Sequence, residues 1–152
     1  MDVYVAEFIE TLKEQDKQIE EMLSDIDPQG INWRPKHNVN SIYVLITHII
    51  GSRSYWINQV IGGQDIQRNR DAEFSSWGND IQKLISNLHD TTTRCISTLE
   101  NLRPQDFTMA RQIRGKQYTV PWCLVHAIEH SGYHLGQIRL LKKQLNHTAG
   151  QV

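Results

Sequence analysis

Three histidines near the end of the chain are spaced so that they could act together on a metal ion. His126, His130 and His134 follow one another at intervals of four residues. In a helix, residues at i and i+4 share a face with Cβ atoms roughly 5–6 Å apart, close enough for two imidazoles to bind one ion. Cys123 and Leu141 lie on the same face, which indicates that this face turns inward.

His48 is the candidate for a ligand from another helix. It stands in the apolar run from Leu45 to Ile50. A buried ring nitrogen without a partner there would lower the stability of the fold by about 1–3 kcal/mol. Three imidazoles leave positions open for water or substrate, as in catalytic sites, whereas four protein ligands make a closed structural site. The alternative is that these histidines are hydrogen-bonded core residues. His126 could be a fourth ligand, a neighbouring base or a packing residue.

Four helices are expected to position these histidines. Their apolar residues recur at helical spacing with polar residues between them, and no pair of strands is convincing. Two of these helices carry the histidines. Either Asn40 or Ser41 is a suitable N-cap for the first of them, and Thr119 is a suitable N-cap for the second. The predicted helices cover about residues 3–23, 41–61, 78–101 and 120–145.

Two longer segments connect these helices. Residues 64–76 form a polar crossover, and residues 105–118 form either a short hairpin or an irregular loop. Since four amphipathic helices must bury their apolar faces on one another, we predict an all-α protein, a four-helix bundle with a long crossover between helices 2 and 3. A chain of 152 residues suits a single domain, here residues 1–152.

The composition narrows the class of partner. A formal net charge of −1 gives no reason to expect a nucleic acid or an acidic membrane as partner. Two cysteines are too few for a disulfide framework and favour reduced thiols. The first residues lack the basic stretch of a signal peptide, and no apolar run approaches the roughly 20 residues of a membrane span. We therefore expect a cytoplasmic protein with a small-molecule substrate, and neither nucleic acid nor membrane as partner.

The last predicted helix carries a family motif. Its segment 130–138, HSGYHLGQI, resembles the H-x-x-x-H-x-G-Q-I signature of the DinB-like family. Segments 33–35 and 40–42, followed by His48, resemble that family's approach to its second helix, and segment 68–74, RNRDAEF, is similar to the crossover of one branch. The resemblance covers nearly the whole chain. Leu135 stands where the family commonly has arginine, a change that could alter the local surface or substrate contacts.

This resemblance implies a metal centre and a class of activity. The metal would be held by His48, His130 and His134, with zinc or nickel as the first candidates. The expected protein is a divalent-metal-dependent S-transferase or hydrolase that activates a low-molecular-weight thiol or water against a small substrate, and the family often forms homodimers. No catalytic residue and no site for an organic cofactor is assigned. The alternatives are a non-catalytic, stress-associated metal-binding dimer, or a bundle that acts through dimerisation without metal.

Other side chains are expected to surround this centre. Gln137 could orient His134 by a hydrogen bond or serve helix packing, and Ser52 and Tyr55 share the face of His48 and could line a pocket. Cysteines are expected to be inert, buried residues. A basic group could attract an anionic thiol or form an exposed loop: Arg111, Arg114 and Lys116. Three tryptophans are expected to pack, namely Trp56, Trp77 and Trp122. The remaining histidines, His37, His89 and His147, are expected to be exposed.

Overall fold

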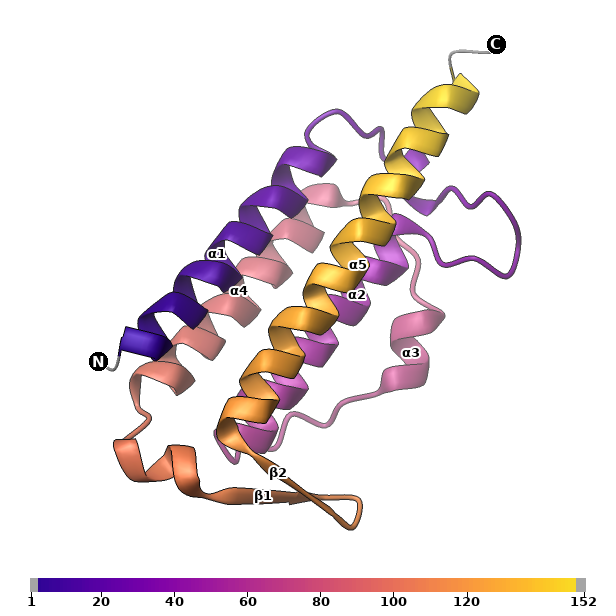
Figure 1. Ribbon diagram of the computed structural model, residues 1–152. Helices are drawn as coiled ribbons and strands as arrows, with labels where there is room; N and C mark the ends of the chain where they lie inside the picture. Colours follow the sequence, from indigo (N-terminus) through magenta and orange to yellow (C-terminus); the bar gives the residue numbers. More distant parts are fainter. Residues whose placement is uncertain (1–2, 150–152) are drawn as a thin grey trace.

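Four long helices form a bundle in the computed structural model, which describes residues 3–149 (Figure 1). The first and second, α1 and α2, each pack against both α4 and α5. The α2 helix continues into a π-helical stretch, η2, without a break. The predicted four-helix bundle is therefore confirmed. The bounds are Val3–Leu23 for α1, Ile42–Arg53 for α2, Ser54–Ile61 for η2, Ile81–Glu100 for α4 and Val120–Ala149 for α5.

The ends of these helices follow from their caps. The Ser41 hydroxyl accepts the amide hydrogen of Val44 (3.3 Å), so Ser41, and not Asn40, is the N-cap among the two that were predicted. The third long helix begins at Ile81 and not at residue 78, because the Asp80 carboxylate caps it. The last helix runs to Ala149, four residues beyond the predicted end.

The long crossover between η2 and α4 contains a short helix, α3 (Arg70–Phe74), that the sequence did not predict. The Asn69 side chain caps it by accepting the amide hydrogen of Ala72 (3.0 Å). This helix packs against α2 and therefore brings crossover side chains beside His48.

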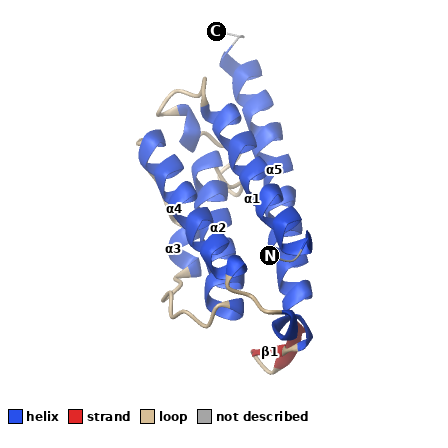
Figure 2. Ribbon diagram, turned by 90° about the vertical axis from the view of Figure 1, so that its left-hand side faces the viewer, coloured by secondary structure: helices blue, strands red, loops and turns tan. Residues whose placement is uncertain are grey.

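The segment before α5 contains the short hairpin that was one of its two predicted forms. A 3₁₀ turn, η3 (Pro104–Thr108), leads into β1 (Ala110–Ile113), which pairs antiparallel with β2 (Lys116–Thr119). Ile113 lies opposite Lys116, so the turn has two residues. The hairpin contacts η2 and the start of α5, at one end of the bundle (Figure 2, where β1 is drawn in red).

Polar side chains divide the core into two apolar clusters, and Arg53 lies at the centre of this layer. Its side chain is fully buried and is paired with the Asp16 carboxylate. Its guanidinium also donates to the side-chain oxygens of Gln15 (2.9 Å), Thr92 (3.1 Å) and Ser131 (3.2 Å). One residue of α2 is thereby bonded to α1, α4 and α5.

No helix within residues 3–149 combines the length and the apolar character that crossing a membrane requires.

Candidate metal centre

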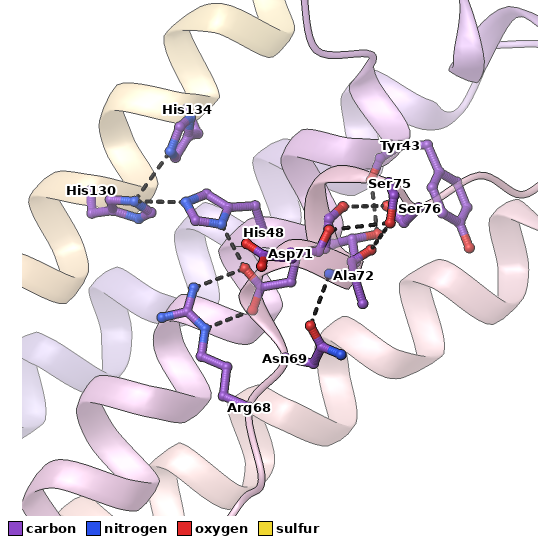
Figure 3. A network of polar contacts seen from close by, with 12 residues as sticks. Tyr43, His48, Arg68, Asn69, Asp71, Ala72, Ser75, Ser76, His130 and His134 are labelled. Atoms are coloured by element: carbon purple, nitrogen blue, oxygen red, sulfur yellow. Dashed lines mark hydrogen bonds and ion pairs between the residues drawn. The ribbon is translucent and has the colours of Figure 1, made fainter.

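The three predicted ligands meet between α2 and α5 (Figure 3). Nε2 of His130 lies 3.1 Å from Nε2 of His48 and 3.2 Å from Nε2 of His134. One ligand atom from each of the three side chains lies within 4.8 Å of the other two. His130 and His134 are one turn apart on α5, and His48 faces them from α2, so the three histidines could hold one metal ion.

The outer ring nitrogens determine how two of these imidazoles are protonated. Nδ1 of His48 lies 2.7 Å from Oε2 of Glu73, and Nδ1 of His134 lies 2.7 Å from Oε1 of Gln137. A carboxylate or amide oxygen only accepts, so each Nδ1 carries the hydrogen and donates it. In the neutral form of each ring, Nε2 then has a lone pair that points toward the other rings, as metal binding requires. The predicted orienting bond from Gln137 is present.

His130 completes this arrangement as a neutral imidazole. Burial, followed by the charges of His134 and His48, lowers the pKa of His130 to about 3. Burial also lowers the pKa of His134. Nδ1 of His130 is buried and has no hydrogen-bond partner among the described residues, so no bond fixes its tautomer. Three imidazoles with converging nitrogens are a donor set that suits zinc, nickel and related divalent ions.

Glu73 is a residue of this centre that the sequence did not reveal. Its buried carboxylate accepts two hydrogen bonds from Arg68, from Nε (2.6 Å) and Nη2 (2.8 Å), besides the one from His48. Burial raises the pKa of Glu73, but the bonds from Arg68 and His48 outweigh it and bring the pKa below its usual value. Glu73 is therefore an ionised acceptor that fixes the ring of His48.

Gly51 makes room for this carboxylate. A Cβ atom at Gly51 would overlap Oε1 of Glu73 and would lie 2.5 Å from its Cδ. Gly51 comes one turn after His48 in α2. Because Gly51 has no side chain, α3 can place the Glu73 carboxylate against the ring of His48. The sequence does not indicate this contact, because Gly51 lies in an apolar helix and Glu73 lies in a polar crossover far along the chain.

Glu73→Gln should weaken zinc binding about tenfold. This is the lower end of the range seen when a residue that hydrogen-bonds to a metal ligand is changed. Glutamine keeps an acceptor for His48 but removes the charge that holds Arg68 and polarises the ring. A competition titration against a chromophoric chelator measures the affinity. Asp71→Asn is the matched control, since Asp71 is exposed on the same short helix. Equal zinc affinity for the two variants would show that Glu73 does not act on the site.

His126 lies outside the three-histidine group. Its ring stacks on Trp122 (centroids 4.9 Å apart, 11° between planes) and meets Trp56 edge-on at 4.8 Å. The His126 and His130 ring centroids are 5.8 Å apart. His126 therefore lines the space beside the centre, and the structure does not bring it to the point where the other three meet.

A cavity of about 430 Å³ opens directly beside the histidines. Ser52 and Tyr55, which were predicted to line a pocket with His48, do so. The π-helical stretch η2 supplies Tyr55 and Trp56 to the wall, and π-helical turns often occur where a helix must aim side chains at a functional site. The cavity is lined by His48, Ser52, Tyr55, Trp56, Arg68, Arg70, Ile113, Arg114, Lys116, Tyr118, His126 and His130.

Several expectations about the surroundings are corrected. Trp77 is 69% exposed, so the expectation that it packs is wrong. Trp56 is partly buried against a core cluster, and Trp122, although 42% exposed, packs against the rings of Tyr118 and His126. Leu135 is 5% exposed and belongs to a core cluster, and it does not line the cavity beside the histidines. Arg111 does not line the cavity, although Arg114 and Lys116 do. His37, His89 and His147 are exposed as predicted.

The cysteines do not take part in this centre. Cys95 and Cys123 are both free thiols that are fully buried. Burial raises the pKa of Cys95 to about 12 and also raises the pKa of Cys123, so both thiols are protonated at neutral pH. The prediction that they are inert, buried side chains agrees with this placement.

Comparison with known families and structures gives one family and several similar folds. The family described as "Protein of unknown function (DUF1572)" matches residues 1–151. A DinB-like protein from Bacillus cereus has a TM-score of 0.75 at 14% identity, over 91% of each chain. A conserved protein from Enterococcus faecalis has a TM-score of 0.77 at 17% identity, over 97% of this chain and 99% of that one. A DinB-like protein from Bacillus subtilis has a TM-score of 0.72 at 19% identity, over 93% and 92%. No curated protein matches.

Proposed function

Because the chain belongs to the DUF1572 family and has the fold of DinB-like proteins, we propose that it is a divalent-metal-dependent enzyme for a small substrate. His48, His130 and His134 hold one ion, zinc or nickel. The observation that carries the proposal is that their three Nε2 atoms converge, while Glu73 and Gln137 hold two of the outer nitrogens.

An open centre favours an enzyme over a structural site. The converging group contains three histidines, and His126 stays outside it, so an ion there keeps positions free for a further ligand. When bound, such an ion lowers the pKa of a water or thiol and thereby makes a nucleophile available near neutral pH. The reaction that follows is transfer of a low-molecular-weight thiol to a small substrate, or hydrolysis of that substrate. A cytoplasmic homodimer belongs to the same proposal.

The residues of the chain have separate tasks in this proposal. Glu73 and Gln137 orient the rings of His48 and His134. Tyr55 and Trp56 cover one side of the cavity and limit the access of water. His126 lines the same cavity, and burial lowers its pKa, so it is neutral at physiological pH and can accept a proton from a nucleophile.

Cobalt(II) loading tests whether the centre has an open position. Cobalt(II) absorbs visible light in a way that depends on its ligands, and it binds to the same donors as zinc. We expect 2-mercaptoethanol or azide to change the absorption bands of the cobalt-loaded protein, because either can occupy a free position. His89→Ala, a change at an exposed histidine, should respond as the wild type does. Bands that neither addition alters would indicate a closed structural site and contradict an enzymatic centre.

A further inference from the structure

Four cations line the cavity beside the three histidines. Arg68 comes from the crossover, Arg70 from α3, and Arg114 and Lys116 from the hairpin, and no aspartate or glutamate is among the lining residues. The whole chain has a net charge of −1, so this positive charge is a local concentration. A cavity lined by one sign of charge raises the local concentration of ligands of the opposite sign.

Three of these cations are not neutralised by the protein. The Glu73 carboxylate pairs with Arg68 through two hydrogen bonds. Arg70, Arg114 and Lys116 have no carboxylate oxygen within 4.0 Å of their charged nitrogens anywhere in residues 3–149. The guanidinium of Arg70 instead lies over the ring of Phe74, 4.8 Å from its centroid. The positive charge of the cavity is therefore available to a ligand.

Arg114 occupies a position that does not favour arginine. It is the first residue of the two-residue hairpin turn, with a φ of +50°, and Gly115 follows with +78°. Turns with two positive φ values favour Asn-Gly or Asp-Gly, because other L-residues are strained there. The hairpin thus carries a long cationic side chain where asparagine would suit the backbone better. Backbone strain of this kind is concentrated at functional sites.

Part of the cavity wall is aromatic. The indole of Trp56 meets the rings of Tyr55, Tyr118 and His126 edge-on, with centroid distances of 5.2, 5.9 and 4.8 Å. All four rings line the cavity. Flat apolar surfaces of this kind bind the faces of unsaturated groups.

We propose that the ligand of this cavity is a small anion with a flat, unsaturated body. Arg70, Arg114 and Lys116 bind its negative group, a carboxylate or a phosphate, and the aromatic wall binds its body. This inference rests on the proposed function, because it places the reacting part of the same molecule beside His130. It narrows the substrate class of the metal centre to anions.

Calorimetric titration with three naphthalene compounds tests the preference for charge. 1-Naphthoate and 1-naphthyl phosphate carry the two candidate anionic groups, and 1-naphthalenemethanol is their neutral counterpart. We expect at least one anion to bind about tenfold tighter than the alcohol, and about 0.5 M salt to remove most of that difference. The tighter anion identifies the group as carboxylate or phosphate. Equal affinities of all three compounds would overturn the inference.

Variants of the hairpin test which residues provide that preference. Arg114→Asn should weaken binding of the anion about fivefold without lowering the melting temperature, because asparagine suits the turn. Lys116→Gln should weaken it by a similar factor and leaves the turn residues unchanged. Lys83→Gln is the matched control, with the same charge change on an exposed residue that does not line the cavity. Wild-type affinity in both hairpin variants, or an equal loss in the control, would overturn the inference.

The titrations are made on both zinc-free and zinc-loaded protein, which separates this inference from the proposed function. Zinc binding without a preference for anions would overturn the inference and leave the proposed metal centre in place. An anion preference that depends on Arg114 in protein that binds no zinc would support the cationic cavity and overturn the proposed metal-dependent function.

Discussion

His130→Ala should abolish stoichiometric zinc binding while the helical content of the protein is retained. Nε2 of His130 lies within 3.2 Å of both other ligand nitrogens, so its loss leaves two imidazoles without the atom between them. Loss of a residue that hydrogen-bonds to a metal ligand lowers metal affinity by up to about 100-fold, so loss of a ligand itself should lower it by at least that factor. The ring is only partly buried, so α5 and its core contacts should persist. Chelator competition measures the affinity, and circular dichroism measures the helical content.

His89→Ala is the matched control for this change. His89 is exposed, and its side chain pairs only with Glu20 on the surface, so its removal should leave both zinc affinity and helical content unchanged. If His130→Ala bound one zinc ion per chain with wild-type affinity, the assignment of the three ligands would be wrong.

Arg53→Met should lower the free energy of unfolding by about 3–5 kcal/mol, the usual cost of removing one partner of a buried ion pair. The change leaves the Asp16 carboxylate buried without its cation, and it removes the donor of hydrogen bonds to Gln15, Thr92 and Ser131. Methionine has a similar length and keeps part of the packing. Urea denaturation followed by circular dichroism measures the loss.

A second variant separates the unpaired charge from the lost packing. Arg53→Met combined with Asp16→Leu removes both charges, so it should be more stable than Arg53→Met alone. Lys13→Ala, which breaks an exposed pair with Glu10, should change the free energy of unfolding by less than about 1 kcal/mol. A double variant that is no more stable than Arg53→Met would mean that the buried charge of Asp16 is not the cause.

The helices and the histidine group could be predicted because their signals are local. Apolar spacing gave the four long helices, and the i, i+4 spacing put His130 and His134 on one face. The contact between His134 and Gln137 spans three residues of one helix, so the sequence also indicated it. The resemblance to DinB-like proteins is confirmed by the similar folds, and it correctly paired His48 with a helix far along the chain.

The parts that could not be predicted depend on contacts between distant segments. Glu73 is 25 residues from His48, and it reaches the ring because α3 docks on α2 beside Gly51. Arg53 lies inside the predicted second helix, and its sequence context gives no sign of its partners, yet it is bonded to three other helices. A helical pattern tells which residues face inward, but it does not tell which inward polar groups will meet.

The cationic cavity was predicted only in part, for a similar reason. Arg114 and Lys116 were candidates for anion binding, whereas Arg111, in the same short segment, does not line the cavity. Arg111 pairs with Tyr118 near the base of the hairpin and lines another cavity, beside Thr98 and Asp106, whereas Arg114 and Lys116 lie at the turn and next to it. The tryptophans show the same limit, since residue type alone predicted packing for Trp77, which is exposed.

Metal analysis of the untagged protein, natively purified, is the most direct test of the three-histidine metal site. We expect about one divalent ion per chain, because three imidazoles with converging nitrogens form one site for such an ion. The ion should leave on treatment with a chelator and return in the same ratio when zinc is added. Protein that contains no such ion, and takes up none after incubation with zinc, nickel and manganese, would contradict the metal centre and the function proposed for it.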